Sequence, residues 1–351
     1  MNSQVDEQYF VDYEDLEIHE LMLKDRPRQE AYHNAILKNK QLFKDKVILD
    51  VGAGTGILSA FCAKAGAKRV YAVEASNLAK LALNVIEENG LSEVVKVIHS
   101  RVEDFSLPDD EKVDIIVSEW MGFYLLHEGM LDSVIFARNK FLKDGGLMFP
   151  TSATLYVAPC SVPSRYQYWD NVDGIKMNTF GEMLRNVKSH KPEITQIDAD
   201  CLLHEGTVVS WFNLETVTLE ELDNINLQEV VAIQKSGNHQ GFCLWFDCGF
   251  PSSSGKFEDM TIFSTSPKAP ETHWKQCIIV LPPNACEAME ENTPIAFKLS
   301  MQRNPNDVRK YNLEMEMLDS DDVEHPLPCN CFMTKCILTK AHLQTMDTDD
   351  E

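Results

Sequence analysis

Two glutamates bracket one short segment whose other residues are largely apolar and aromatic. The segment runs from Ser118 to Met130 and contains Glu119 and Glu128. On a continuous helix, which turns about 100° per residue, this spacing would place the two carboxylates on opposite faces. They can converge only if the residues between them loop out and back, which Gly122 makes easier. Paired carboxylates in an aromatic surround favour a planar cation with several N–H donors, and a guanidinium suits them better than an ammonium.

The neighbours of this segment predict where it lies in the fold. The apolar run Val113–Val117 precedes it and is typical of a buried parallel strand, and an amphipathic helix is predicted from about Met130 to Leu142. Loops at the carboxyl ends of such strands are where open α/β sheets bind ligands. A simpler interpretation stays open: one glutamate ends a strand, and the other begins a helix, where the helix dipole favours it.

A glycine-rich turn near the start of the chain is the second motif. Lys46–Val51 predicts a strand, and Gly52-Ala53-Gly54-Thr55-Gly56 leads from it into a helix that extends through Ala65. Glycines at such a turn let the backbone touch a ligand that faces the helix N-terminus. The spacing differs from the dinucleotide pattern Gly-x-Gly-x-x-Gly, and the motif alone is weak. Glu74 ends the next predicted strand, at the spacing of an acid that binds ribose hydroxyls.

The order of the predicted elements divides the chain. Strands and helices alternate up to Pro150, which predicts a doubly wound α/β domain. Strand-like segments dominate afterwards and predict an antiparallel sandwich or barrel. We therefore expect an N-terminal helical cap over residues 1–42, an α/β domain over 43–150 and a β-rich domain over 151–351. An aromatic and helical insertion at about 161–198 predicts an arm that contacts another subunit. A helical excursion packed on its own barrel is the alternative.

The composition excludes some classes of function. The 351 residues are 44% apolar and 25% charged, as in a soluble globular protein of two domains. A net charge of -23 argues against binding to a phosphate backbone and favours cationic partners, such as Arg- or Lys-rich tails, although solubility alone also explains it. No apolar run approaches the roughly 20 residues of a membrane span, and we see no secretory signal.

The cysteines and one histidine are the remaining groups that could do chemistry. Cys329, Cys331 and Cys336 cluster near the end of the chain, but no paired Cys-x-x-Cys and no nearby histidine set completes a zinc site. We therefore expect no metal, and free thiols in a reduced intracellular chain. A lone His273 is more often structural than functional. The set Thr272-His273-Trp274 at a loop-to-strand junction is more specific.

Taken together, these motifs resemble the protein arginine N-methyltransferases, and within them the type I enzymes. The matching stretches extend from Tyr9 to about Lys335: Tyr9-Phe10 with Tyr13, Ile18-His19-Glu20, Met22–Asp25, Leu49–Gly56, Glu74, Ser118–Gly122 with Glu128, and Thr272–Trp274. The resemblance implies a Rossmann-like S-adenosylmethionine domain, followed by an antiparallel β-barrel with a helical dimerisation arm.

The resemblance also implies an activity. Such an enzyme transfers methyl groups from S-adenosylmethionine to guanidinium nitrogens of protein arginines, giving monomethyl- and asymmetric dimethylarginine and S-adenosylhomocysteine, with no metal. The implied partners are Gly/Arg-rich segments or histone tails and a second copy of the chain. Neither a membrane nor direct nucleic-acid binding is expected. The implied location is the cytoplasm, the nucleus or both.

Individual residues carry these implied roles. The residues that match the family's cofactor site are His19, Arg28, Asp50, Gly52, Gly54, Gly56, Glu74, Val102 and Glu103. Arg28 would clamp the cofactor carboxylate, Glu74 would bind the ribose hydroxyls, and Glu103 would meet the adenine edge.

The matches to the family's catalytic residues are Tyr13, Met22, Asp25, Glu119, Glu128, Met130 and His273. Glu119 and Glu128 would hold the guanidinium. His273, paired with Asp25, would relay the proton, and Tyr13 would brace the arrangement. Met22 and Met130 would wall the pocket and favour asymmetric dimethylation.

Three positions depart from the family pattern. Glu17 stands where glycine is usual, His127 where tyrosine is usual and Asp173 where an aromatic residue is usual. They bear on substrate preference, specific activity and dimerisation.

A nicotinamide dehydrogenase fits the glycine spacing and the β-rich half poorly, and a small-molecule methyltransferase would not need the barrel. The rival from another class is an inactive scaffold that binds cationic tails.

Overall fold

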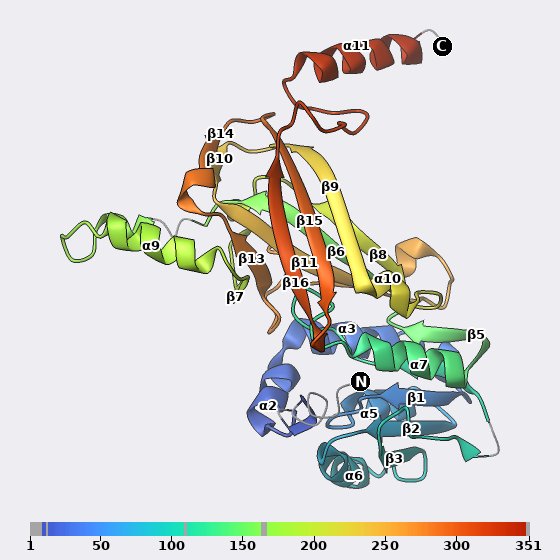
Figure 1. The fold of residues 1–351 in the computed structure, drawn as a ribbon. Coiled ribbons are helices and arrows are strands. Elements are labelled where there is room, and N and C mark those ends of the chain that lie inside the picture. Colours follow the sequence, from blue (N-terminus) through green and yellow to red (C-terminus); the bar gives the residue numbers. More distant parts are fainter. Residues whose placement is uncertain (1–8, 12, 109–110, 163–166, 349–351) are drawn as a thin grey trace.

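The computed structural model describes residues 9–11, 13–108, 111–162 and 167–348. A parallel-sheet half and an antiparallel half follow one another along the chain, with the change between Phe149 and Ser152 (Figure 1). Parts of the expected cap and arm, at residues 1–8, 12 and 163–166, and residues 349–351 lie outside the described residues.

The N-terminal cap contains two consecutive helices, α2 (Leu16–Lys24) and α3 (Arg26–Leu37), followed by the short α4 (Lys40–Phe43). Pro27 lies in the first turn of α3, where its missing N–H would have no helical partner in any case. Asp25 ends α2 and caps α3 by accepting a hydrogen bond from a backbone amide.

The first half is built on a parallel sheet with the strand order β3-β2-β1-β4-β5. Its strands are β1 (Val47–Val51), β2 (Arg69–Glu74), β3 (Val95–His99), β4 (Val113–Val117) and β5 (Leu142–Phe149). The connecting helices are α5 (Ile57–Lys64), α6 (Leu78–Glu88) and α7 (Leu131–Phe141). The strand order reverses between β1 and β4, so the carboxyl ends of these two strands open the crevice where such sheets bind ligands.

The second half is antiparallel. Its strands are β6 (Ser152–Cys160), β7 (Glu193–Thr195), β8 (Thr207–Asn213), β9 (Asn224–Ala232), β10 (Gly237–His239), β11 (Gly241–Phe250), β12 (Thr261–Ser264), β13 (Gln276–Val280), β14 (Glu287–Met289), β15 (Pro294–Asn304) and β16 (Asp307–Leu318). Strands β7-β13-β11-β6-β8 form one sheet, with β12 beside β11, and β16-β15-β9 form another. The two halves confirm the predicted fold class, a Rossmann-like domain followed by an antiparallel barrel.

Short helices complete the second half: η2 (Gln167–Asp170), α9 (Asn178–Lys188), η3 (Ala199–Cys201), α10 (Leu219–Asp223), η4 (Phe257–Asp259), η5 (Pro283–Ala285) and α11 (Thr334–Thr348). Helix α9 projects sideways from the barrel, and α11 lies at the barrel end away from the parallel sheet (Figure 1). Within the described ranges, no helix combines the length and the apolar character that crossing a membrane requires.

The cysteines near the end of the chain have a neighbour that their spacing did not indicate. We expected no histidine beside Cys329, Cys331 and Cys336, yet His325 lies among them, and the four possible ligand atoms all lie within 4.8 Å of one another. The spacing His-x3-Cys-x-Cys-x4-Cys has no paired Cys-x-x-Cys, and only the folding of the loop after β16 brings the histidine to the sulfurs.

Candidate active site

The loop with two glutamates turns back on itself at the carboxyl end of β4. Gly122 and Leu125 exchange two backbone hydrogen bonds of 3.0 Å, which closes a tight turn between the carboxylates. Tyr124, Leu125 and Glu128 have positive φ values of 41°, 71° and 79°. Such angles are uncommon for residues other than glycine, and they concentrate at sites where the surroundings enforce them. The chain therefore does loop out and back, and Glu119 and Glu128 line the same pocket.

Glu128 is held by two tyrosines from the N-terminal segment. The hydroxyl of Tyr9 donates to Glu128 Oε2 at 3.2 Å, and the hydroxyl of Tyr13 donates to the same oxygen over a shorter distance. Burial is the main reason why the pKa of Glu128 rises to about 7. The hydrogen bonds from the two tyrosines lower this pKa, and the nearby charge of Glu119 raises it further. This carboxylate is thus costly to ionise in the free protein, and a bound cation would favour its charged form.

Glu119 is paired with Arg28 from α3. Nε and Nη2 of Arg28 donate to Glu119 Oε2 at 3.0 and 2.7 Å, and Nη1 donates to the carbonyl oxygen of Met22 at 3.2 Å. Both side chains of the ion pair are only 9% exposed. Arg28 therefore lies in the pocket, as expected of a cofactor-clamping residue, but it contacts the first glutamate of the loop.

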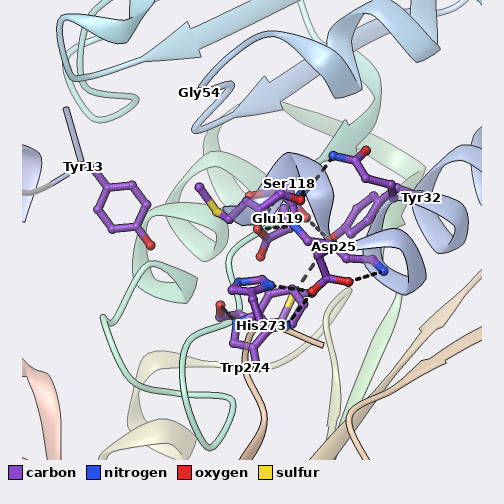
Figure 2. A network of polar contacts seen from close by, with 12 residues as sticks. Tyr13, Asp25, Tyr32, Gly54, Ser118, Glu119, His273 and Trp274 are labelled. Carbon is purple, nitrogen blue, oxygen red and sulfur yellow. Dashed lines mark hydrogen bonds and ion pairs between the residues drawn. The ribbon is translucent and has the colours of Figure 1, made fainter. Parts of the chain in front are cut away.

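Hydrogen bonds with other parts of the chain fix the position of the loop. Tyr32 donates to the carbonyl oxygen of Ser118 at 2.9 Å, and the hydroxyl of Ser118 donates to Val51 at the end of β1 at 2.8 Å. The indole of Trp274 donates to the carbonyl oxygen of Met121 at 2.8 Å. Figure 2 shows this network around Glu119. The α/β half and the barrel half together set the position of the loop.

His273 and Asp25 pair as the resemblance implies. Asp25 Oδ2 accepts hydrogen bonds from Nδ1 of His273 at 2.6 Å and from its backbone amide at 2.8 Å (Figure 2). Burial opposes ionisation of Asp25, but these bonds and one from the Arg28 amide hold its pKa below the ordinary value. Since the carboxylate accepts, the proton lies on Nδ1, and Nε2 is left for proton exchange. Neither residue lines the pocket.

The glycine turn forms the opposite wall. Gly52 and Gly54 line the pocket with φ values of 71° and 53°, and a Cβ at Gly52 would overlap the end of the Met130 side chain. The backbone amide of Gly54 donates to Glu74 Oε2 at 2.8 Å. His19 lies against Gly54 and donates from Nε2 to the carbonyl oxygen of Tyr13 at 2.8 Å. A turn so close to the pocket tolerates glycine alone and fits a ligand that touches the backbone.

The pocket brings together most of the predicted site residues. Its lining includes Tyr13, His19, Met22, Arg28, Gly52, Gly54, Glu74, Val102, Glu103, Glu119, Glu128 and Met130, and its empty volume is about 1080 Å³ out to the open mouth. Asp50 and Gly56 do not line it. Asp50 is fully buried and accepts from the Ser59 hydroxyl at 2.7 Å, while Gly56 packs closely against Ala82 of α6. Burial raises the pKa of Asp50 to about 7, and the hydrogen bond from the Ser59 hydroxyl limits this rise.

One residue of the site was missed. Arg309 on β16 lines the pocket, and its guanidinium lies 3.9 Å from the ring centroid of Tyr9. Its Nη1 donates to the carbonyl oxygen of Glu128 at 2.8 Å, and the amide of Glu128 donates to the carbonyl oxygen of Arg309 at 2.7 Å. These contacts join the barrel to the loop and to the N-terminal segment. No local pattern in the sequence indicates them, because the partners are far apart in the chain.

Comparisons with known proteins agree with this geometry. The profile of the arginine methyltransferase oligomerization subdomain matches residues 151–321, and that of a methyltransferase domain matches residues 48–146. Protein arginine N-methyltransferase 6 of Danio rerio is 38% identical over 91% of this chain and 91% of its own length. A probable protein arginine N-methyltransferase 6 of Arabidopsis thaliana is also 38% identical, over 88% of this chain and 78% of its own length. The chain belongs to the protein arginine N-methyltransferase family.

Solved structures support the same assignment. A Trypanosoma brucei enzyme–prozyme heterotetrameric complex with AdoHcy matches with a TM-score of 0.75 and 32% identity, over 90% of this chain and 97% of that chain. Arabidopsis thaliana protein arginine methyltransferase 10 matches with a TM-score of 0.76 and 30% identity, over the same shares. This methyltransferase accordingly uses S-adenosylmethionine to methylate arginine, and the glycine cradle and acidic pocket fit that cofactor and substrate.

Proposed function

We propose that this methyltransferase acts on arginines in cationic protein segments and forms asymmetric dimethylarginine through the pocket shared by Glu119 and Glu128. The observation that carries the proposal is the convergence of the two carboxylates beside a glycine cradle. A net charge of -23 supports the attraction of Gly/Arg-rich segments or histone tails.

In this mechanism the carboxylates orient the substrate. S-adenosylmethionine supplies the methyl group when bound. Glu119 and Glu128 accept N–H donors of the guanidinium, hold it flat and draw positive charge towards the nitrogens they bind. The lone pair of the remaining terminal nitrogen would then be more available to take the methyl group that the bound cofactor supplies. That nitrogen would gain the methyl group and give up one proton, and the cofactor would leave as S-adenosylhomocysteine.

The residues around the pair have supporting roles in this proposal. Arg28 uses three of its five N–H donors in the contacts described above, which leaves two for the carboxylate of the cofactor. In this proposal Glu74 would bind the ribose hydroxyls and Glu103 would meet the adenine edge. Because the His273 ring does not line the pocket, its Nε2 would take up the released proton by way of solvent.

The product and the residue specificity can be measured together. The full chain would be incubated with methyl-labelled S-adenosylmethionine and a Gly/Arg-rich peptide, or a matched peptide with Lys in place of each Arg. We expect label on arginine, none in the lysine control, and fragmentation typical of asymmetric dimethylarginine. Symmetric product, or monomethylarginine alone, would contradict the product assignment, while cofactor binding without label would favour the inactive scaffold.

The proposed assembly is a homodimer formed through the arm. Helix α9 exposes Phe180, Met183 and Val187, which lie at helical spacing on one face. The matched oligomerization subdomain includes this helix. An exposed apolar stripe on a projecting helix suits a second copy of the chain.

The arm can be tested by one substitution. Met183→Glu places a charge on the apolar face, so we expect the dimer to dissociate at concentrations at which the wild type stays dimeric. Light scattering after size exclusion measures the mass, and Glu182→Ala on the same helix serves as the control. A Met183→Glu protein that remains dimeric would show that another surface makes the interface.

The proposed location is the cytoplasm, the nucleus or both. None of the ten cysteines forms a disulfide, which supports a reducing compartment. Fractionation of cells that express the untagged chain tests this, and recovery in a secreted fraction would contradict it.

A further inference from the structure

Four buried side chains gather in the loop after β16 and the first turn of α11, away from the catalytic pocket. They are His325, Cys329, Cys331 and Cys336, and none is more than 9% exposed. The three sulfurs converge on one atom, Nδ1 of His325, at 3.5, 3.4 and 3.2 Å. No other residue type is needed to complete a set of four ligands.

We propose that these four residues bind one Zn²⁺ ion. Zn–S bonds of about 2.3 Å and a Zn–N bond of about 2.0 Å in a tetrahedron place each sulfur about 3.5 Å from the nitrogen. The three observed separations lie within a few tenths of an ångström of that value. Three cysteines and one histidine form a standard closed set for a structural zinc ion, with no open position for catalysis.

The histidine is already in the state that zinc requires. Its Nε2 lies 2.8 Å from the carbonyl oxygen of Ser320. Because a carbonyl can only accept, Nε2 carries the proton and Nδ1 presents a lone pair to the three sulfurs. Zinc-bound histidines commonly donate their other N–H to a carbonyl in this way, which fixes the ring. In addition, the amide of Cys331 donates to the sulfur of Cys329 at 3.4 Å.

Two features beside the cluster would offset the negative charge of zinc-bound thiolates. Cys336 lies in the first turn of α11, where the helix dipole stabilises negative charge. Lys335 extends over the same loop and donates to the carbonyl oxygens of Ser320 and Asp321 at 3.3 and 3.4 Å. Three thiolates with one Zn²⁺ leave a single negative charge, which these neighbours offset.

A disulfide accounts for the arrangement less well. It would join only two of the three sulfurs, at about 2.05 Å, and would leave the third sulfur and the histidine without a function. All ten cysteines of the chain are free in this structure. A cluster of neutral thiols fits no better, since the one lone pair of Nδ1 cannot accept from three S–H groups at once.

The position of the cluster indicates what the metal does. The loop packs only a small apolar set around the three cysteines, with Ala232 and Met333, and it leaves Leu327 and Phe332 exposed. A segment with so small a core needs an additional stabilising link, such as a metal ion. Helix α11 begins at the cluster and extends away from the barrel, at the end opposite the parallel sheet (Figure 1). The zinc would thus fasten the loop and the base of α11 to the barrel.

Metal analysis of the full chain, purified without a histidine tag under reducing conditions, tests the proposal. We expect about one zinc ion per chain in the wild type and in Cys201→Ser, and less than about one-fifth of an ion in Cys336→Ser or His325→Ala. Hydrogen exchange of residues 319–340 should quicken by about tenfold or more after chelation, while β1 stays protected.

A second measurement uses the wild-type protein, so it does not require the ligand variants to fold. Co²⁺ exchanged into the wild type should give the visible bands of a tetrahedral site and sulfur-to-cobalt charge transfer, and Cys201→Ser should give the same spectrum. The proposal is overturned if the wild type holds no zinc after equilibration with Zn²⁺, if Cys336→Ser holds as much, or if two of the cysteines form a disulfide in the protein purified under reducing conditions.

Discussion

Replacing Glu128 by Gln is expected to lower kcat/KM for an arginine peptide by about 10²–10³-fold. The amide keeps the size of the side chain and can still accept from Tyr13, but it removes the charge that holds and polarises the guanidinium. A preorganised charged contact in a buried site contributes on this scale. Initial rates with labelled cofactor measure the loss, and calorimetry should show cofactor binding within a few-fold of the wild type.

The same variant should be more stable than the wild type at alkaline pH. Burial raises the pKa of Glu128 to about 7, so the folded chain keeps a proton that the unfolded chain has already lost above pH 4.5. Stability therefore falls as the pH rises from about 4.5 to 7, and the full cost of the buried charge is present above pH 7. We expect Glu128→Gln to gain about 1–3 kcal/mol at pH 8, and most of this gain should vanish by pH 5.

Asp247 provides a matched control. It is a half-buried carboxyl on β11 whose pKa is also raised by burial, and it does not line the pocket. Asp247→Asn should therefore gain stability at pH 8 without losing activity. If Glu128→Gln keeps activity within about tenfold, the paired carboxylates do not hold the substrate. If it loses cofactor binding as well as activity, its role is structural.

The fold could be predicted from the sequence because its signals are local. The β1 strand, the glycine turn and α5 follow one another in a short stretch, and each has its own propensity. Pro27 and Asp25 likewise mark the boundary of α2 and α3 within a few residues. The second half was also recognisable as a series of strand-like segments. Their pairing was not, because β9, β15 and β16 meet through contacts between distant segments that no short-range pattern encodes.

The active site likewise combines features that local sequence patterns indicate with contacts between distant segments. The tight turn that lets Glu119 and Glu128 share a pocket was inferred from their spacing and from Gly122. The contacts of Arg309 with Tyr9 and Glu128, in contrast, join three distant segments. His325 was missed for a different reason, because the cysteines were compared with a paired Cys-x-x-Cys pattern that this loop does not follow. The chemistry of single motifs is thus visible in the sequence, while the neighbours that tune it are set by tertiary structure.

Gly122→Ala should disable the enzyme although it alters no chemical group of the site. A Cβ at this position would overlap the carbonyl oxygen of His127 and lie 2.6 Å from its carbonyl carbon. Both are backbone atoms, so no rotation of a side chain relieves the clash. The turn between the glutamates must open, and Glu128 must shift relative to Glu119. A shift of about 1 Å costs on the order of 10²-fold in rate, and we expect kcat/KM to fall by about that factor.

The control for this change is Gly145→Ala. Gly145 has a φ of 72° and nothing within 4 Å of an added Cβ, so alanine there is strained without meeting a neighbour. It should cost about 1–2 kcal/mol of stability and leave kcat/KM unchanged. Thermal unfolding and initial rates of both variants separate the two effects. Full activity in Gly122→Ala would mean that the turn adapts without moving Glu128, and that the closure at Gly122 does not set the distance between the carboxylates.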